Sequence, residues 1–313
     1  MQERLIQGLE GVGDKLRGCV LTIGNFDGVH LGHTRIIQTA RALGQAHRAP
    51  VAALTFEPPP DLVIRPDDEP KRLTPHEEKC RLLLAAGCDY VITARADRRL
   101  LSMSADEFIL IVIVARFAPR HLVEGENFFF GRGRSGSIET LRAASIRAGY
   151  TLHVVAPAMV ELAGGPARIS STLIRGLVAA GDIEQANRCL GREFALFGRV
   201  RAGEGRGRLL EYPTANIAPA GQVCPADGVY AGRAEVAGVT TAAAISIGAQ
   251  PTFGPGRKRS VEAFLLNAGG DYYDERMVLS FHRFLRPQRR FDSAEQLKAQ
   301  MAKDIERVRE ICE

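Results

Sequence analysis

GNFDGVHLGH, residues Gly24 to His33, separates two stretches of different periodicity. The stretch before it, Cys19 to Asn25, is short, apolar and rich in β-branched residues. The stretch after it repeats apolar side chains such as Ile37 and Ala40 at helical spacing. Because strands and helices show these two periods, the sequence predicts a strand, a loop and a helix in that order.

This junction has the features of an anion site. The free N–H groups and the dipole at a helix N-terminus attract phosphate, and Gly28 and Gly32 would allow a phosphate to approach the backbone closely. His30 and His33 add two hydrogen-bond donors. A single histidine at a strand end is more often a structural residue, but two histidines flanked by glycines on a tight turn favour phosphate chemistry.

Length and composition favour two domains in 313 residues, each large enough for its own core. The six cysteines show no CxxC spacing, which disfavours a zinc site or a disulfide framework and indicates reduced thiols in a cytoplasmic protein. The N-terminus lacks a signal-peptide pattern, and the longest apolar run, residues 108–115, is far shorter than the ~20 residues of a membrane span. We therefore expect a soluble protein with no membrane partner.

The charge distribution disfavours nucleic acid as a partner. There are 41 basic and 36 acidic residues, which give a net charge of only +5. Basic clusters at residues 131–136, 254–259 and 286–290 lie in loops, the first two of them rich in glycine, and the chain contains no tryptophan. Nucleic-acid binders more often carry a continuous basic face with interleaved aromatic residues, so small phosphorylated ligands are the better expectation.

Strand-like and helix-like segments alternate from residue 19 to about residue 157, which is typical of a parallel sheet. Ser104 with Glu107, and Thr74 with Glu77, have the spacing of a capping box at a helix start. The expected strands after the first are residues 51–56, 89–94, 120–125 and 151–157, and the expected helices include residues 137–149, 168–181 and 182–191.

A different pattern begins at Phe194, where short strand-like runs are separated by loops of glycine and proline. It predicts a small antiparallel β-barrel of about six strands. A C-terminal amphipathic helix follows Ser293, with Leu297, Met301, Ile305 and Val308 as its buried stripe. The predicted domains are residues 1–187 and 188–313.

A second group of phosphate-binding candidates lies at RISSTLIR, Arg168 to Arg175. Ser170, Ser171 and Thr172 would form a helix N-terminus, while the two arginines bracket it with forked cationic donors. By itself the stretch fits an ordinary serine-capped surface helix equally well. Together with a Gly/His loop in the same domain, it fits the outer phosphates of a nucleoside triphosphate.

These two motifs resemble the HxGH nucleotidyltransferase superfamily, and more closely the N-terminal half of the bacterial bifunctional riboflavin kinase/FMN adenylyltransferase (FAD synthetase) family. GNFDGVHLGH, TFEPPP, GENFFFGRGRSG and RISSTLIR follow one another in the order of that family. The resemblance implies a Rossmann-like α/β nucleotidyltransferase domain of the HxGH type. Its reaction would be in-line attack of FMN on the α-phosphate of ATP, giving FAD and pyrophosphate.

The resemblance also implies roles for individual residues. His30 and His33 would be catalytic and hold the α-phosphate in the transition state. Phe128 and Phe130 are candidate walls for the flavin, although loop packing explains them equally well. The implied ATP and phosphate contacts are Gly24, Phe26, Gly28, Asn127, Arg168, Ser171, Thr172 and Arg175, of which the last four would hold pyrophosphate.

The second domain has its own candidate site in GRVRAGEGRGRLLEYPTANI, residues 198–217. Glycines such as Gly203 and Gly207 would let a loop fold over polyphosphate, although a flexible barrel turn is an equal alternative. Thr214 and Asn216 are two residues apart on a predicted strand, so both point to the same side. Oxygen ligands of this kind suit Mg²⁺ with its bound phosphates.

PTAN after a glycine-rich loop is similar to the riboflavin kinase half of the same family, and GVYAG, SIGAQPTFG and VEAFLLN follow in the family's order. The resemblance implies that this domain phosphorylates riboflavin to FMN with ATP and Mg²⁺, using Gly203 and Gly207 at ATP. It makes Glu262 the general base for the ribityl 5′-hydroxyl; without that context, Glu262 would be interpreted as a solvent-facing strand residue. Departures from the family pattern are Glu211, Asn267 and DYYDERM at residues 271–277.

Other functions stay open at this point. An adenylyltransferase for a pantetheine or nicotinamide derivative would not need the PTAN region, and a flavin-binding regulator without turnover would not need a general base. An enzyme with only one working half is the nearest alternative. The sequence does not indicate an oligomeric state.

Overall fold

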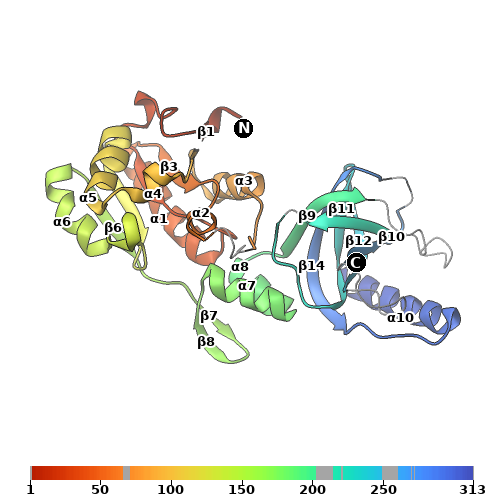
Figure 1. The fold of residues 1–313 in the computed structure, drawn as a ribbon. Coiled ribbons are helices and arrows are strands. Elements are labelled where there is room, and N and C mark those ends of the chain that lie inside the picture. The colour runs from red at the N-terminus through yellow and green to blue at the C-terminus, as the bar shows by residue number, and fades with distance from the viewer. Residues whose placement is uncertain are drawn as a thin grey trace. The chain divides into compact units, whose positions relative to one another are not determined.

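The computed structural model describes residues 2–65, 71–201, 214–219, 221–248, 260–268, 270 and 272–312 (Figure 1). The chain divides into two units. One comprises Met1–Pro70, His76–Glu161 and Pro166–Ile169, and the other comprises Lys71–Pro75, Leu162–Gly165 and Ser170–Glu313. In this division the two helices that precede the barrel belong to the second unit. The predicted boundary between residues 187 and 188 stays a prediction.

The first unit contains the predicted parallel sheet. Its six strands have the order β1-β4-β3-β2-β5-β6, and each neighbouring pair is parallel. The strands are β1 (Leu5–Gln7), β2 (Val20–Ile23), β3 (Val51–Phe56), β4 (Tyr90–Ala94), β5 (His121–Gly125) and β6 (Thr151–Val155).

Hydrophobic residues cover both faces of this sheet, which explains why its strands are almost continuously apolar. Leu21 and Ile23 of β2 belong to one core cluster, together with Phe117. Val20 of the same strand belongs to the other cluster, together with Ile37. Alternate residues of one strand therefore enter opposite cores.

The helices of the first unit include one of the two predicted capping boxes; α3 begins at His76, and the cap at Thr74 and Glu77 stays a prediction. The Ser104–Glu107 capping box is confirmed, since each side chain accepts the backbone N–H of the other residue, at 3.2 and 2.8 Å. The helix that it opens continues as a π-helix. The described helices are η1 (Gln2–Arg4), η2 (Asp14–Leu16), α1 (Leu31–His47), α2 (Pro60–Ile64), α3 (His76–Ala86), α4 (Arg98–Ser102), α5 (Ala105–Glu107), η3 (Phe108–Phe117), η4 (Arg132–Arg134) and α6 (Ile138–Ala148).

A hairpin of β7 (Met159–Leu162) and β8 (Gly165–Arg168) was not expected from the sequence. Arg168 is the last residue of this hairpin, and the next helix begins after it at a serine cap, as predicted. α7 extends over Ser171–Ala180, and Ser170 caps it by accepting the Leu173 N–H at 3.2 Å. α8 follows over Ile183–Leu190.

The barrel of the second unit is confirmed. It is a closed antiparallel barrel with the strand order β10-β13-β12-β11-β14-β9. Odd-numbered residues of β13, such as Val261 and Ala263, are buried inside, whereas Glu262 is only half-buried. The strands are β9 (Phe194–Arg201), β10 (Thr214–Pro219), β11 (Gly228–Val236), β12 (Val239–Gly248), β13 (Ser260–Leu265) and β14 (Arg276–Arg286).

The C-terminal helix α10 (Ala294–Cys312) packs on the outside of this barrel (Figure 1). Ser293 caps it by accepting the Gln296 N–H at 3.3 Å, as expected. Ile305 and Val308 of the predicted stripe are buried, while Leu297 and Met301 are half-buried. No helix in the part of the chain that the structure describes is long and apolar enough to cross a bilayer.

Candidate active sites

The loop of the GNFDGVHLGH motif connects β2 to α1, as predicted. β2 lies where the sheet order reverses, because the chain passes from it to β3 on one side and later to β5 on the other. Ligands of open α/β sheets bind at the carboxyl ends of strands at this point. The loop adopts left-handed backbone angles at Phe26 (φ 49°), Gly28 (φ 83°) and Val29 (φ 38°). For the two residues other than glycine such angles cost about 1–3 kcal/mol each, and burial of both side chains holds them in place.

His30 and His33 lie against each other at the start of α1. Their rings are stacked, with centroids 3.7 Å apart and planes 16° from parallel. The backbone N–H of His33 donates to Nδ1 of His30 at 3.4 Å, so His30 is the N-cap of the helix. Because Nδ1 accepts, a neutral His30 carries its hydrogen on Nε2 and can donate it to a ligand.

Two neighbours fix this pair of histidines. The ring of Phe26 contacts His33 edge-on, with centroids 5.2 Å apart, and Phe26 itself is only 2% exposed. A Cβ at Gly32 would lie 3.1 Å from the His30 ring. A side chain at position 32 would therefore press on the His30 ring, so the glycine leaves room for the histidine stack.

Glu124, at the end of β5, is a residue that sequence reasoning missed. Its carboxyl group is buried and accepts the backbone N–H of Ile23 at 2.8 Å, directly before the loop. Burial raises its pKa well above the usual range of a carboxyl group, because a buried carboxylate loses its contact with water. The only sequence signal was a single acidic residue inside the apolar run of β5.

A cavity of about 470 Å³ opens beside the loop in the first unit. It brings together Gly24 and the segment of Asn127, Phe128 and Phe130 that the sequence singled out. The rings of Phe128 and Phe130 are stacked, 5.4 Å apart. Phe130 lines the cavity and also belongs to the core, and its role as a flavin wall stays a prediction.

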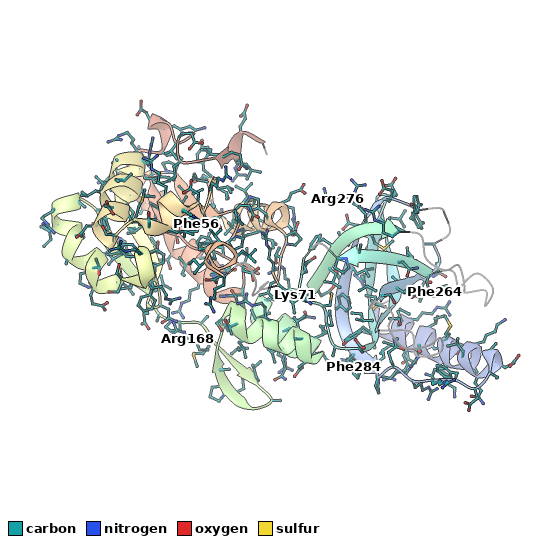
Figure 2. All side chains as sticks on the ribbon, in the orientation of Figure 1. Phe56, Lys71, Arg168, Phe264, Arg276 and Phe284 are labelled. Carbon is teal, nitrogen blue, oxygen red and sulfur yellow. The ribbon has the colours of Figure 1, made fainter. Side chains whose placement is uncertain are left out.

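The same cavity has lining residues that the sequence did not reveal. Phe56 ends β3 and lines the cavity (Figure 2). Phe129 is 47% exposed, and the guanidinium of Arg134 lies 4.7 Å from the centre of its ring. Both belong to the loop after β5, where the glycines and arginines suggested only a basic cluster.

The RISSTLIR residues are divided between the two units. Arg168 ends β8 in the first unit (Figure 2). Ser171, Thr172 and Arg175 belong to the first turns of α7 in the second unit. There, the guanidinium of Arg175 lies 3.4 Å from the hydroxyl of Thr172, so a cation and a hydroxyl stand side by side near a helix N-terminus.

The barrel brings together the candidate residues of the second domain. Asn216 of β10 pairs directly with Glu262 of β13, and Thr214 pairs with Phe264. Paired residues of antiparallel strands project from the same face, so the amide and the carboxylate are neighbours outside the barrel. The hydroxyl of Ser260 lies 3.1 Å from Oε1 of Glu262.

The structure describes only some of the remaining residues that the sequence singled out in the second domain. Gly203, Gly207 and Glu211 lie outside the described residues. Asn267 adopts a left-handed φ of 56° in the turn after β13, a conformation that asparagine tolerates better than most residues, so this departure from the family pattern suits the turn. Within the described ranges, no three His, Cys, Asp or Glu side chains form a ready metal site.

Together, a parallel α/β domain with paired histidines at its switch point and a barrel carrying Thr, Asn and Glu on one face define a two-domain enzyme of nucleotide-dependent transfer. Residues 13–173 match the FAD synthetase family, and residues 190–312 match the riboflavin kinase family. The chain belongs to the bifunctional riboflavin kinase/FMN adenylyltransferase family. It is a riboflavin kinase and an FMN adenylyltransferase that converts riboflavin to FMN and FAD.

Relatives of nearly the same length support this assignment. The chain is 36% identical over 314 residues to the bifunctional riboflavin kinase/FMN adenylyltransferase of Escherichia coli K12, covering 98% of this chain and 97% of the relative. It is 37% identical over 306 residues to the enzyme of that name from Pseudomonas fluorescens, with the same coverage. A crystal structure titled as a macrolide-efflux protein from Streptococcus pneumoniae has a TM-score of 0.87 at 27% identity, covering 98% of this chain and 99% of that chain.

Proposed function

We propose that adenylyl transfer takes place at the GNFDGVHLGH loop, with His30 and His33 as the catalytic residues. The observation that carries this proposal is the stacked pair at the N-terminus of α1, where the N–H of His33 donates to Nδ1 of His30. An oxygen of the FMN phosphate attacks the α-phosphorus of ATP, and the bond to the bridging oxygen of pyrophosphate breaks. The two imidazoles and the helix dipole stabilise the charge that builds on the α-phosphate.

The remaining residues of the loop have supporting roles in this proposal. Gly24 and Gly28 bring the backbone close to the nucleotide, and Phe26 acts through its contact with His33. The outer phosphates bind to Arg168, Ser171, Thr172 and Arg175. The side-by-side guanidinium and hydroxyl on α7 support this role, because leaving pyrophosphate needs both charge and hydrogen bonds.

The flavin of FMN is proposed to bind in the cavity beside the loop. A volume of about 470 Å³ falls within the usual range for ligand pockets, and such pockets combine apolar walls with few polar groups. The stacked rings of Phe128 and Phe130 supply the walls, while Asn127 supplies a polar group on the same segment.

For the kinase reaction we propose Glu262 as the general base. It takes the proton of the ribityl 5′-hydroxyl while that oxygen bonds to the γ-phosphorus of ATP and ADP leaves. Thr214 and Asn216 fit Mg²⁺, because they offer neutral oxygen donors beside a carboxylate and Mg²⁺ in such sites keeps waters and phosphates as its other ligands. The ion would neutralise phosphate charge. Gly203 and Gly207 are proposed to contact ATP.

We further propose that the protein works in the reducing cytoplasm with small-molecule partners only, namely riboflavin, FMN and ATP. None of its six cysteines forms a disulfide. Burial raises the pKa of the Cys19 and Cys88 thiols to about 12, so both stay protonated and unreactive at neutral pH. Reduced thiols of this kind are typical of cytosolic proteins.

One experiment tests how the residues divide the two reactions. The purified chain is incubated with riboflavin, ATP and Mg²⁺, and the flavins are separated by chromatography. We expect FMN first and FAD later. Replacing Mg²⁺ by a chelator should stop phosphorylation; riboflavin kinase activity that persists without a divalent cation would contradict the roles given to Thr214 and Asn216.

A further inference from the structure

A row of polar side chains crosses the outer face of the barrel at Glu262. Ser246 of β12 is paired with Glu262 on one side, and Asn216 of β10 is paired with it on the other. The Cβ atoms of such directly opposed residues lie about 4.5–5.5 Å apart. Ser246, the first residue of the SIGAQPTFG stretch, is therefore an immediate neighbour of Glu262.

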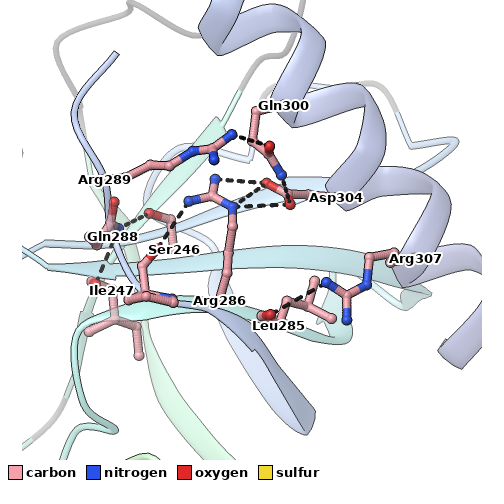
Figure 3. Close-up of polar contacts among 10 residues, drawn as sticks. Ser246, Ile247, Leu285, Arg286, Gln288, Arg289, Gln300, Asp304 and Arg307 are labelled. Atoms are coloured by element: carbon pink, nitrogen blue, oxygen red, sulfur yellow. Dashed lines mark hydrogen bonds and ion pairs between the residues drawn. The ribbon is translucent and has the colours of Figure 1, made fainter.

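Ser246 is held by Gln288, from the segment that follows β14 (Figure 3). Nε2 of Gln288 lies 2.8 Å from Oγ of Ser246 and 3.3 Å from the carbonyl oxygen of Ile247. A carbonyl oxygen only accepts hydrogen bonds, so the amide group facing it is the NH₂ group, and Gln288 is also the donor to Ser246. The Ser246 hydroxyl then keeps its own proton for another acceptor. Its cross-strand neighbour, the carboxylate of Glu262, is such an acceptor.

The segment that carries Gln288 is tied to helix α10. Nε of Arg286 lies 3.1 and 3.0 Å from the two carboxylate oxygens of Asp304, and Nη2 lies 2.8 Å from Oδ2. Asp304 is only 3% exposed and also accepts from Gln300 at 2.8 Å (Figure 3). Removing one partner of a buried pair leaves an uncompensated charge, so this contact holds the end of β14 firmly against α10.

We propose that Gln288 and Ser246 are positioning residues of the riboflavin kinase reaction, held in place from α10 by Asp304 and Arg286. The inference rests on the proposed role of Glu262 as the general base. A hydrogen bond from the Ser246 hydroxyl orients the carboxylate of Glu262 before the proton is taken. Helix α10 thus supports the base indirectly, through Arg286, Gln288 and Ser246.

The test compares Ser246→Ala and Gln288→Ala in the full chain with the matched control Arg307→Ala. Arg307 also joins α10 to β14, through the carbonyl oxygen of Leu285 at 3.4 Å, but lies outside the row. For the first two variants we expect kcat of FMN formation to fall about tenfold with KM changed less than about twofold, because a positioning residue acts on the transition state. Arg307→Ala should behave as the unsubstituted chain.

FAD formation from supplied FMN is measured in the same samples, because it reports on the other reaction. An unchanged kcat of FMN formation in Ser246→Ala and Gln288→Ala would overturn the proposal. A matching fall in both reactions would also overturn it, since a merely structural contact acts in that way. Glu262→Gln tests the premise, the role of Glu262 as the general base, by itself. If this variant phosphorylates riboflavin normally, the base assignment fails. If it is inactive while Gln288→Ala has normal activity, only the positioning role is refuted.

Discussion

Gly32→Ala should slow adenylyl transfer without lowering the thermal stability of the protein. The new Cβ would lie 3.1 Å from the His30 ring, whereas ordinary contact begins at 3.4 Å, so the ring must withdraw by 3.4 − 3.1 = 0.3 Å. A displacement of 1 Å costs about 10²-fold in rate. If the loss of activation free energy is proportional to the displacement, 0.3 Å lowers the rate about fourfold. The stacked His33 ring must shift as well. We therefore expect a fall of about four- to tenfold in FAD formation.

The stability of this variant should move in the other direction. Gly32 lies in the first turn of α1 and alanine favours a helix over glycine by about 1 kcal/mol, so the melting temperature should hold or rise. Gly176→Ala in α7 is the control, because a Cβ there has open space and should stabilise without slowing either reaction. FAD formation from FMN and FMN formation from riboflavin are assayed separately. A full rate of FAD formation in Gly32→Ala would refute the idea that the geometry of the histidine stack limits the reaction.

Two further predictions follow from the same structure. His30→Ala should lower FAD formation about 10²- to 10³-fold, as removal of a transition-state donor does, and leave FMN formation intact; Glu262→Ala should do the reverse when FMN is supplied, and loss of both reactions in either folded variant would disprove the division of labour. Burial first, and neighbouring His47 second, lower the pKa of His121 and of His153, whose ring nitrogens lie 3.1 Å apart. Because the unfolded chain then binds more protons, the stability from these neutral rings is present above about pH 6.5 and is lost as the pH falls through the lowered pKa values. Between pH 7.5 and pH 5, the melting temperature of His153→Gln should fall less than that of the unsubstituted chain, by about 2–4 °C. An equal fall in the two proteins would argue against the histidine contribution.

Local sequence patterns predicted most of the helices and strands, because interactions between residues close in the chain decide where these elements begin and end. The capping box at Ser104 and Glu107 is complete within four residues, so one sequence suffices to find it. β1 escaped prediction for the opposite reason: in Leu5–Gln7 only Ile6 is buried, and three residues are too short to show a period. The hairpin of β7 and β8 contains glycine and proline and alternates between half-buried and exposed residues, which is also the pattern of a loop.

The sites were predictable as motifs but not as geometries. The spacing of His30 and His33 indicated two donors, but their stacking depends on a cap at Nδ1 and on the absence of a Cβ at Gly32. The neighbours of Glu262 could not be derived, since they depend on the register of strands far apart in the chain. The SIGAQPTFG motif contains Ser246, but its place directly opposite the candidate base became visible only in the strand register.

With Glu262 as the proposed base, its pairing with Asn216 and Ser246 would also make the kinase reaction a reporter of correct assembly of the barrel. Side chains alternate between the two faces of a strand, so a shift of β13 by one residue would turn Glu262 into the interior and Val261 outward. Spectroscopic measures of β-content would scarcely change in such a misfolded species. Phosphorylation of riboflavin by a refolded sample therefore counts the molecules in which the strands closed in register, which bulk secondary-structure signals cannot do.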